Sequence, residues 1–404
     1  MPSILQKKLG ISKIAIVNVI LVVNALCWYL HFFSFLKNNS GAVDTNLVIL
    51  VGFNLLAVSL SALLSTKLIQ KVKNRLKFLT YWMAVGVLLS PLYLLIGNLS
   101  FFGVTLLGCI IGIYFGLGSP VLMGYYSAST DDTNRAKISG LAIFLTFTCF
   151  IVLSIVNLPI LFLAIVMTVW KLCGFLAVVL LKPPESKFNE DNSVSYKHVL
   201  TSRSVLLYFV PWLLFSIVNN FAFPVLDVGF PSDVVRSVTM VENFLAGILA
   251  ILFGFLADRF GRKRLVFFGF VMLGLGYAIL GLLPSYNRGL YFYTISDSIA
   301  WGIFLPLFLL TIWGDIAGEK NGEKFFAIGF LPYILSNFLQ VIFGYYVANS
   351  ITNFSIVFSF ASFFLFITIV PLFLAPETMS EKKRRYKELR DYFEKASKKV
   401  EKSK

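Results

Sequence analysis

The chain has 404 residues, of which 58% are hydrophobic and 14% are charged, and its formal net charge is +15. Because soluble domains carry about 25% charged residues, this composition excludes an ordinary soluble domain. The basic residues lie between apolar runs rather than in one patch, so we expect no nucleic acid partner.

About twelve apolar runs, separated by short polar connectors, make up most of the chain. A bilayer core of about 30 Å needs roughly 20 apolar residues in a helix, and only a helix or a closed barrel satisfies its backbone there. We therefore predict an all-α membrane protein with twelve transmembrane helices in two six-helix pseudo-repeats. The predicted spans are 14–36, 46–66, 78–98, 101–125, 138–158, 160–181, 204–224, 235–257, 265–283, 290–313, 325–348 and 354–375.

The basic residues predict how the chain is oriented. If both termini are cytoplasmic, 31 of the 35 Lys and Arg residues fall on the cytoplasmic side, as the positive-inside rule requires. The first apolar run is too long for a signal-peptide core and no small-residue cleavage site follows it, so we expect it to be retained as a span. Three Asn-x-Ser sequons, at Asn38, Asn98 and Asn353, all fall in predicted outer connectors. We expect a multi-pass plasma-membrane protein that acts as a monomer.

A polar connector, residues 182–203, divides the chain into halves that look duplicated. Pro184-Glu185-Ser186 after the sixth span matches Pro376-Glu377-Thr378 after the twelfth, about 190 residues apart. The predicted parts are an N-terminal bundle (1–181), a cytoplasmic linker (182–203), a C-terminal bundle (204–375) and a basic cytoplasmic tail (376–404). Paired halves predict a site at their interface near the middle of the membrane.

The connector between spans eight and nine, GFLADRFGRKR, carries the most specific local motif. Its glycine permits a tight reversal, and its acid can pair with the arginines that follow. This segment resembles a loop signature of the Major Facilitator Superfamily. The matching residues are Gly254, Asp258, Arg259, Gly261, Arg262 and Lys263.

The resemblance implies two six-helix bundles, alternating access by rocking, and a central cavity lined by spans one, four, seven and ten. It also implies that the motif is a conformational lock. The corresponding segment between spans two and three keeps Lys73 and Arg75, but it has Ile69 in place of the acid and Val72 in place of the glycine. The Pro-Glu-Ser and Pro-Glu-Thr motifs resemble those of sugar porters, whereas the span-seven Gln pattern of that branch is missing.

Ionisable residues inside spans are the first candidates for substrate or proton binding, because they are rare there and usually functional. Asp297 in span ten is the first choice, and Glu242 in span eight lies at a similar depth. Lys171 in span six is a third candidate. The alternatives are a solvated carboxylate for Asp297, a structural partner for Glu242, and snorkelling or pairing for Lys171.

Uncharged polar and aromatic residues complete the candidate site. Aromatic faces with amide donors and acceptors suit a polyhydroxylated ligand or one of mixed polarity, and the alternative is ordinary packing between helices. These candidates are Asn24, Tyr114, Asn219, Asn220, Trp301, Asn337 and Gln340.

The sequence favours a secondary active transporter for a small organic solute, with proton-coupled symport through Asp297 or Glu242. The alternatives are an uncoupled facilitator, a drug or metabolite efflux carrier, and a non-transporting membrane sensor. The chain has two histidines, and its four cysteines have no metal-ligand spacing. The sequence therefore does not favour a metalloenzyme. We expect no enzyme activity, no cofactor and no metal, and as partners a small solute, H⁺ and the lipid bilayer.

Overall fold

The computed structural model describes residues 13–39, 44–156, 158–184, 186, 188–283, 287–346, 350–351 and 353–379. Within these ranges twelve helical segments are long and apolar enough to cross a membrane. Each corresponds to one predicted span, so the prediction of a twelve-helix all-α membrane protein is confirmed. The lysines before the first span and the basic tail from residue 380 lie outside the described residues.

The first bundle contains six spans. The third span changes from an α-helix to a 3₁₀ helix at Ser90, next to Pro91, which has no backbone N–H to donate. The elements are α2 (Lys13–Asn39), α3 (Asp44–Val72), α4 (Arg75–Leu89) with η1 (Ser90–Asn98), α5 (Phe101–Ser129), α6 (Arg135–Ile155) and α7 (Ile160–Leu181).

The second bundle follows the short linker helix α8 (Tyr196–Thr201). Its tenth span contains a π-helical segment that begins at Leu305-Pro306. The elements are α9 (Arg203–Gly229), α10 (Ser232–Phe260), α11 (Arg262–Leu282), α12 (Asn287–Phe304) with η2 (Leu305–Thr311) and α13 (Ile312–Ala317), α14 (Glu323–Gly329) with α15 (Leu331–Tyr346), and α16 (Phe354–Ile367) with α17 (Ile369–Leu374).

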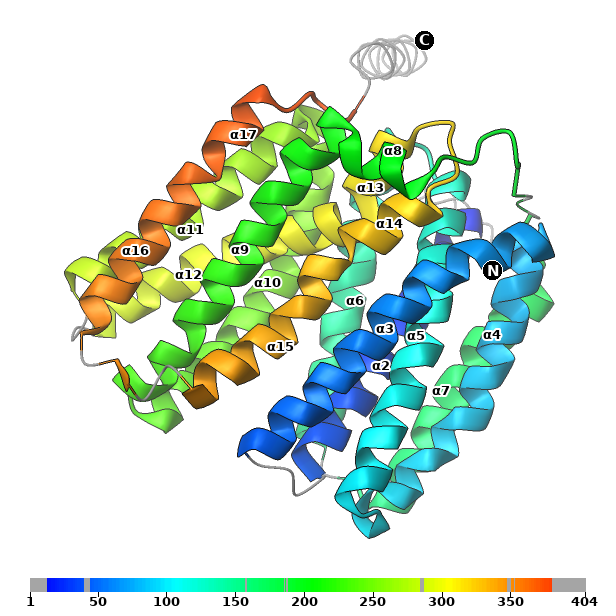
Figure 1. Ribbon diagram of the computed structural model, residues 1–404, viewed down its shortest axis with the longest axis horizontal. Helices are drawn as coiled ribbons and strands as arrows, with labels where there is room; N and C mark the ends of the chain where they lie inside the picture. The colour runs from blue at the N-terminus through cyan, green and yellow to red at the C-terminus, as the bar shows by residue number, and fades with distance from the viewer. Residues whose placement is uncertain are drawn as a thin grey trace, which may run out of the picture.

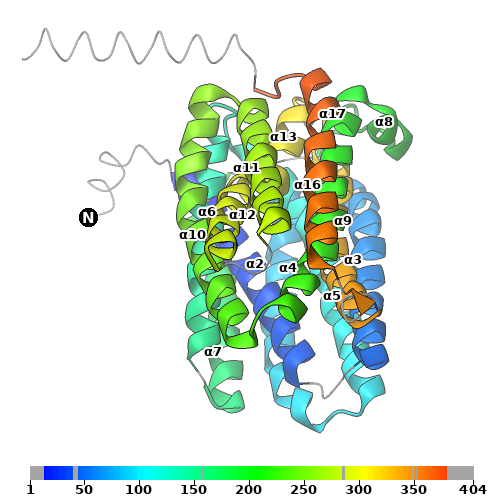
Figure 2. The same cartoon turned by 90° about the vertical axis from the view of Figure 1, so that its left-hand side faces the viewer.

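The two bundles meet at one end of the molecule and diverge toward the other (Figure 1). We call the end where they meet the basic end. It carries the connectors 73–74, 130–134, 182–202, 261 and 318–322. The helices run roughly along one direction, with α8 at the basic end (Figure 2).

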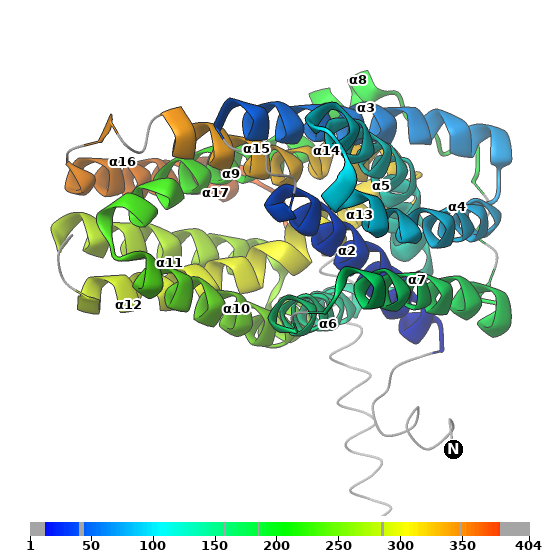
Figure 3. The same cartoon turned by 90° about the horizontal axis from the view of Figure 1, so that it is seen from below.

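Helices of the two bundles pack against each other on both sides of the interface. α3 packs against α15, and α6 packs against α10 (Figure 3). The second contact is very close, because a Cβ atom on Gly140 of α6 would lie 2.1 Å from the carbonyl oxygen of Ala250 on α10. Gly254 of α10 is equally close to the backbone of α6 at Ala136, at 2.4 Å. Glycine at both positions therefore allows the helices to touch backbone to backbone.

Large apolar side chains cover the outer surface of both bundles. Leu88, Phe102 and Phe373 are 76%, 77% and 65% exposed, respectively. A surface of this kind is stable against lipid rather than water.

Candidate functional site

A cavity of about 290 Å³ lies between the bundles, lined by side chains from both. Lys37, in the last turn of α2 and far from the basic end, is one of the lining residues. The cavity therefore extends toward the end where the bundles diverge.

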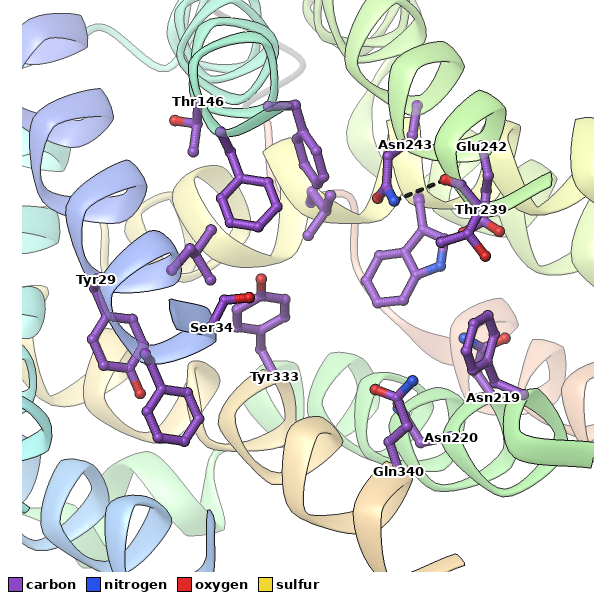
Figure 4. A pocket seen from close by; sticks show the side chains of 18 of the residues that line it. Tyr29, Ser34, Thr146, Asn219, Asn220, Thr239, Glu242, Asn243, Tyr333 and Gln340 are labelled. Carbon is purple, nitrogen blue, oxygen red and sulfur yellow. Dashed lines mark hydrogen bonds between the residues drawn. The ribbon is translucent and has the colours of Figure 1, made fainter. Parts of the chain in front are cut away.

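The two walls of the cavity differ in chemistry (Figure 4). The first bundle contributes mostly apolar and aromatic side chains, with Ser34, Lys37 and Thr146 as its polar members. Its apolar members are Tyr29, Leu30, Phe33, Phe147 and Phe150. The second bundle contributes the carboxyl group and all the amides, beside the rings of Phe223, Trp301 and Tyr333. Its polar members are Asn219, Asn220, Thr239, Glu242, Asn243 and Gln340.

Two carboxyl groups meet at the wall of the second bundle. Glu242 lines the cavity and is 7% exposed, whereas Asp297 lies behind it and is fully buried. The two carboxyls are close neighbours, and Trp301 is a further neighbour of Asp297. Among the described residues no ion pair involves either carboxyl. A pair of buried acids without a cation is a site that favours binding of a proton or another cation.

A chain of hydrogen bonds leads from this pair back to the cavity. The Tyr293 hydroxyl donates to Asp297 Oδ2 at 3.3 Å and lies 3.2 Å from the Tyr277 hydroxyl. Tyr277 in turn donates to Asn219 Oδ1 at 2.7 Å. Both tyrosines are fully buried. Because Asn219 and Glu242 both line the cavity, the chain connects two points on the same wall.

The predicted candidates separate into two groups. Glu242, Asn219, Asn220, Trp301 and Gln340 lie together on the cavity wall, with Asp297 behind them. The side chain of Asn337 lies outside the described residues. Sequence reasoning did not single out Tyr277 and Tyr293, because a tyrosine in an apolar span is usually packing and nothing in the sequence marked these two.

Lys171, Asn24 and Tyr114 form a separate cluster inside the first bundle and do not line the cavity. The Lys171 Nζ atom lies 4.7 Å from the ring centroid of Trp28, and 5.2 Å from those of Trp82 and Tyr114. Within the part of the chain that the structure describes, neither this nitrogen nor the Tyr114 hydroxyl has a hydrogen-bond partner. Asn24 donates to the backbone of Trp170. The lysine is therefore held by aromatic faces rather than paired with an acid.

Ion pairs close the basic end between the bundles. Arg75 Nε lies 2.5 Å from Glu323 Oε1, and both side chains are buried, at 5% and 1% exposure. The same guanidinium donates to Asn321 at 2.9 Å and to Ser186 at 3.0 Å. Arg75 therefore ties the start of α4 to the start of α14 and to the linker.

The motif predicted as a lock forms a second buried network at this end. Arg262 pairs with Asp258 at 2.8 Å and with Asp315 at 3.0 Å, and Asp315 also pairs with Arg135 of the first bundle. The Asp258 carboxylate accepts hydrogen bonds from the first backbone N–H groups of α6, at Ala136 (3.2 Å) and Lys137 (2.8 Å). These contacts join α10, α11 and α13 of the second bundle to α6 of the first.

Three residues of the motif have other roles. Gly261 has φ +100, and a Cβ atom there would lie 2.4 Å from the Glu377 carboxylate, which accepts a bond from the Arg262 backbone. Arg259 stacks over Phe260, and the Lys263 ammonium donates to the carbonyl of Phe373. In the first bundle the residue with positive φ is Lys73 (φ 58), one position after the Val72 that the sequence comparison placed opposite the glycine.

Comparison with known proteins gives one family. The sequence profile of the Major Facilitator Superfamily matches residues 206–403. An uncharacterized transporter of Buchnera aphidicola subsp. Schizaphis graminum (strain Sg) is 25% identical over 140 residues, which is 35% of this chain and 35% of that protein. The match thus spans about a third of that relative's length.

Two solved structures share the fold. A bacterial homologue of the iron transporter ferroportin, crystallised in an outward-facing state, superposes with a TM-score of 0.64 at 10% identity. The human organic anion transporter MFSD10 (TETRAN) superposes with a TM-score of 0.60 at 14% identity. In both cases 89% of this chain and 98% of the other chain are covered.

Proposed function

Because the chain belongs to the Major Facilitator Superfamily, in fold over its described length and in sequence over residues 206–403, we propose that it is a proton-coupled secondary transporter. It moves a small organic solute by alternating access. The observation that carries the proposal is the buried Glu242–Asp297 pair at the wall of a cavity between two bundles.

The basic end is the cytoplasmic end in this proposal. With both termini cytoplasmic, the predicted inner segments hold 31 of the 35 Lys and Arg residues, and the connectors of the basic end belong to these segments, which the positive-inside rule places in the cytoplasm. The cavity then extends toward the outside of the plasma membrane, and the ion pairs Arg75–Glu323 and Arg135–Asp315 close the inner side.

Solute release to the cytoplasm requires these inner ion pairs to separate. Each links the two bundles, so breaking them lets the bundles rock about the cavity and opens the basic end. Solute moves because the same cavity is open to one side at a time.

A count of donor protons supports proton binding at the carboxyl pair. Three contacts link Asp297, Tyr293, Tyr277 and Asn219 in sequence, and each needs one proton. The amide oxygen of Asn219 can only accept, and each tyrosine supplies one proton. Two phenolic protons thus satisfy two of the three contacts, and the third requires a proton on the Asp297 carboxyl.

The proton count also links the pair to the cavity. When Asp297 is protonated, it donates to Tyr293, Tyr293 donates to Tyr277 and Tyr277 donates to Asn219. When Asp297 is ionised, Tyr293 donates to it instead, and the contact between the tyrosines loses its proton. Proton binding at the carboxyl pair therefore reorients the two tyrosine hydroxyl groups. The chain of hydrogen bonds that they form ends at Asn219 on the cavity wall.

The test uses purified protein in vesicles, with the solute first found by a ligand-stability screen in detergent, since selective binding to the native state raises its melting temperature. Asp297→Asn is expected to abolish uphill transport driven by a proton gradient and to leave downhill flux. The matched control is Asp233→Asn, the same change at an exposed acid in the first turn of α10. Unchanged accumulation by Asp297→Asn rejects proton coupling at this pair and leaves the uncoupled facilitator.

A further inference from the structure

We infer that the solute is an amphipathic organic cation, a primary or secondary amine on an aromatic or apolar body, which exchanges for a proton at the Glu242–Asp297 pair. The inference rests on the proposed transport function and specifies its substrate class. Three observations carry it: the unequal walls of the cavity, its hydrogen-bond acceptors, and its charge.

The wall of the first bundle predicts the apolar part of the solute. Tyr29, Phe33, Phe147 and Phe150 line the cavity from the first bundle. Figure 4 shows Tyr29 on the opposite side of the cavity from Asn219 and Glu242. A polyhydroxylated solute would need hydrogen-bonding groups on all sides, and this wall supplies few. A solute with one polar end and one apolar end fits the division.

The opposite wall offers acceptors beside the Glu242 carboxyl. The Asn220 side-chain nitrogen donates to the carbonyl of Ser216 at 2.7 Å, and that of Asn243 donates to the carbonyl of Thr239 at 2.8 Å. Each amide thereby uses one of its two donors within its own helix, and its oxygen has no protein partner among the described residues. An ammonium carries up to three donors and no acceptor, so it can use the Glu242 carboxyl and these amide oxygens together.

The charge of the site points the same way. Glu242 is the acidic residue among the lining side chains, and Asp297 lies directly behind it. The basic lining residue, Lys37, lies in the last turn of α2, on the other bundle. An ammonium beside Glu242 stabilises the ionised form of the carboxyl, so its arrival releases one proton from the pair. Aromatic faces such as Trp301 add cation–π attraction.

Four probes with defined chemistry test the class. 4-Phenylbutylamine, 4-phenylbutan-1-ol and 4-phenylbutyrate share one body and differ in their head group, and D-glucose has hydroxyls without the body. The amine is expected to raise the melting temperature of the full chain in detergent at about pH 7, and the other three are not. An equal or larger shift with the alcohol, the acid or glucose overturns the inference, as does no shift with the amine at millimolar concentration.

Amine binding to variants and proton release on binding test whether the amine binds at the Glu242–Asp297 pair. Glu242→Gln is expected to weaken amine binding by at least about tenfold, because it removes a charge-assisted hydrogen bond, whereas Asp233→Asn leaves it unchanged. Since Glu242→Gln can also affect folding, the wild-type protein provides a second readout. Amine binding in weakly buffered detergent is expected to release about one proton per site. Binding without proton release overturns exchange.

Failure of this inference differs from failure of the proposed function. Accumulation of a neutral or anionic solute that depends on Asp297 retains proton-coupled transport and rejects the amine class. Amine binding with proton release, but without flux in vesicles, retains the site and rejects transport.

Discussion

Arg75 and Glu323 form a buried ion pair that joins the first residue of α4 to the first residue of α14, across the interface between the bundles. The equivalent positions on the other side of the interface are Arg262, at the start of α11, and Arg135, at the start of α6. These are two arginines, and Asp315 lies between them and pairs with both. The same closure is therefore made once by a direct pair and once through a shared acid.

Removing one partner of the direct pair should open the basic end. Glu323→Gln leaves the Arg75 guanidinium buried without its counter-charge, which typically destabilises a structure by about 3–5 kcal/mol. Because the pair joins the bundles only in this state, we expect the population with an open basic end to rise. The measurement is labelling of a Ser127→Cys reporter by a membrane-impermeant maleimide from the basic side, because Ser127 of α5 lies against Gly322 of the second bundle.

Two comparisons separate charge pairing from general damage. The charge exchange Arg75→Glu with Glu323→Arg should bring labelling back toward the parent level. The exposed pair Lys73–Glu190, with side chains 65% and 62% exposed, is the control, because solvent screens its charges and Glu190→Gln should change stability very little. Equal labelling of the parent and Glu323→Gln proteins contradicts a role in closure.

The backbone contact between α6 and α10 gives a steric prediction. Gly140→Ala places a methyl group 2.1 Å from the carbonyl oxygen of Ala250, so the two helices must separate. Overpacking of this kind destabilises by about 1–3 kcal/mol, and we expect this cost to lower the stability of the closed basic end. Gly97→Ala is the matched control, since no atom lies within 4 Å of the new Cβ. Similar melting temperatures and reporter labelling for the two variants refute the prediction.

Lys171 allows a test of whether its charge stabilises the first bundle. Its Nζ atom is buried and has no hydrogen bond or acid beside it among the described residues. Burial of an ion costs several kcal/mol, whereas a desolvated cation–π contact stabilises by about 2 kcal/mol. Lys171→Met keeps the apolar stem and removes the ammonium, so we expect a higher melting temperature. Lys171→Ala removes the stem as well and should lower it by creating a cavity. A large decrease in the melting temperature of Lys171→Met would instead show that the contacts between the ammonium and the surrounding aromatic rings stabilise the bundle.

The sequence predicted the spans well because length and hydropathy depend only on the thickness of the membrane. The predicted first span, 14–36, corresponds to α2 at Lys13–Asn39, and the fourth, 101–125, to α5 at Phe101–Ser129. The start of α4 follows from Asn74, whose side chain accepts a bond from the Lys77 backbone.

The rotation of each helix was not predictable in the same way. In a membrane protein both the lipid face and the packed face of a helix are apolar, so the sequence pattern does not show which side faces the cavity. Asp297 was therefore expected at the cavity, whereas the structure places Glu242 there and Asp297 behind it. The partner of Arg75 was also hidden, because Glu323 is 248 residues away in the chain.

The hydroxyl chain behind the cavity gives the last prediction. Tyr293→Phe removes both the donor to Asp297 and the link to Tyr277, at a stability cost of about 0.5–1.5 kcal/mol. Since the aromatic ring stays, the cavity wall keeps its shape, and downhill flux should continue while uphill accumulation falls. Tyr291→Phe is the control on the same helix, because that side chain is 58% exposed on the outer surface. If Tyr293→Phe accumulates solute as well as Tyr291→Phe does, the hydroxyl chain has no part in coupling, and the carboxyl pair must exchange its proton directly with the cavity at Glu242.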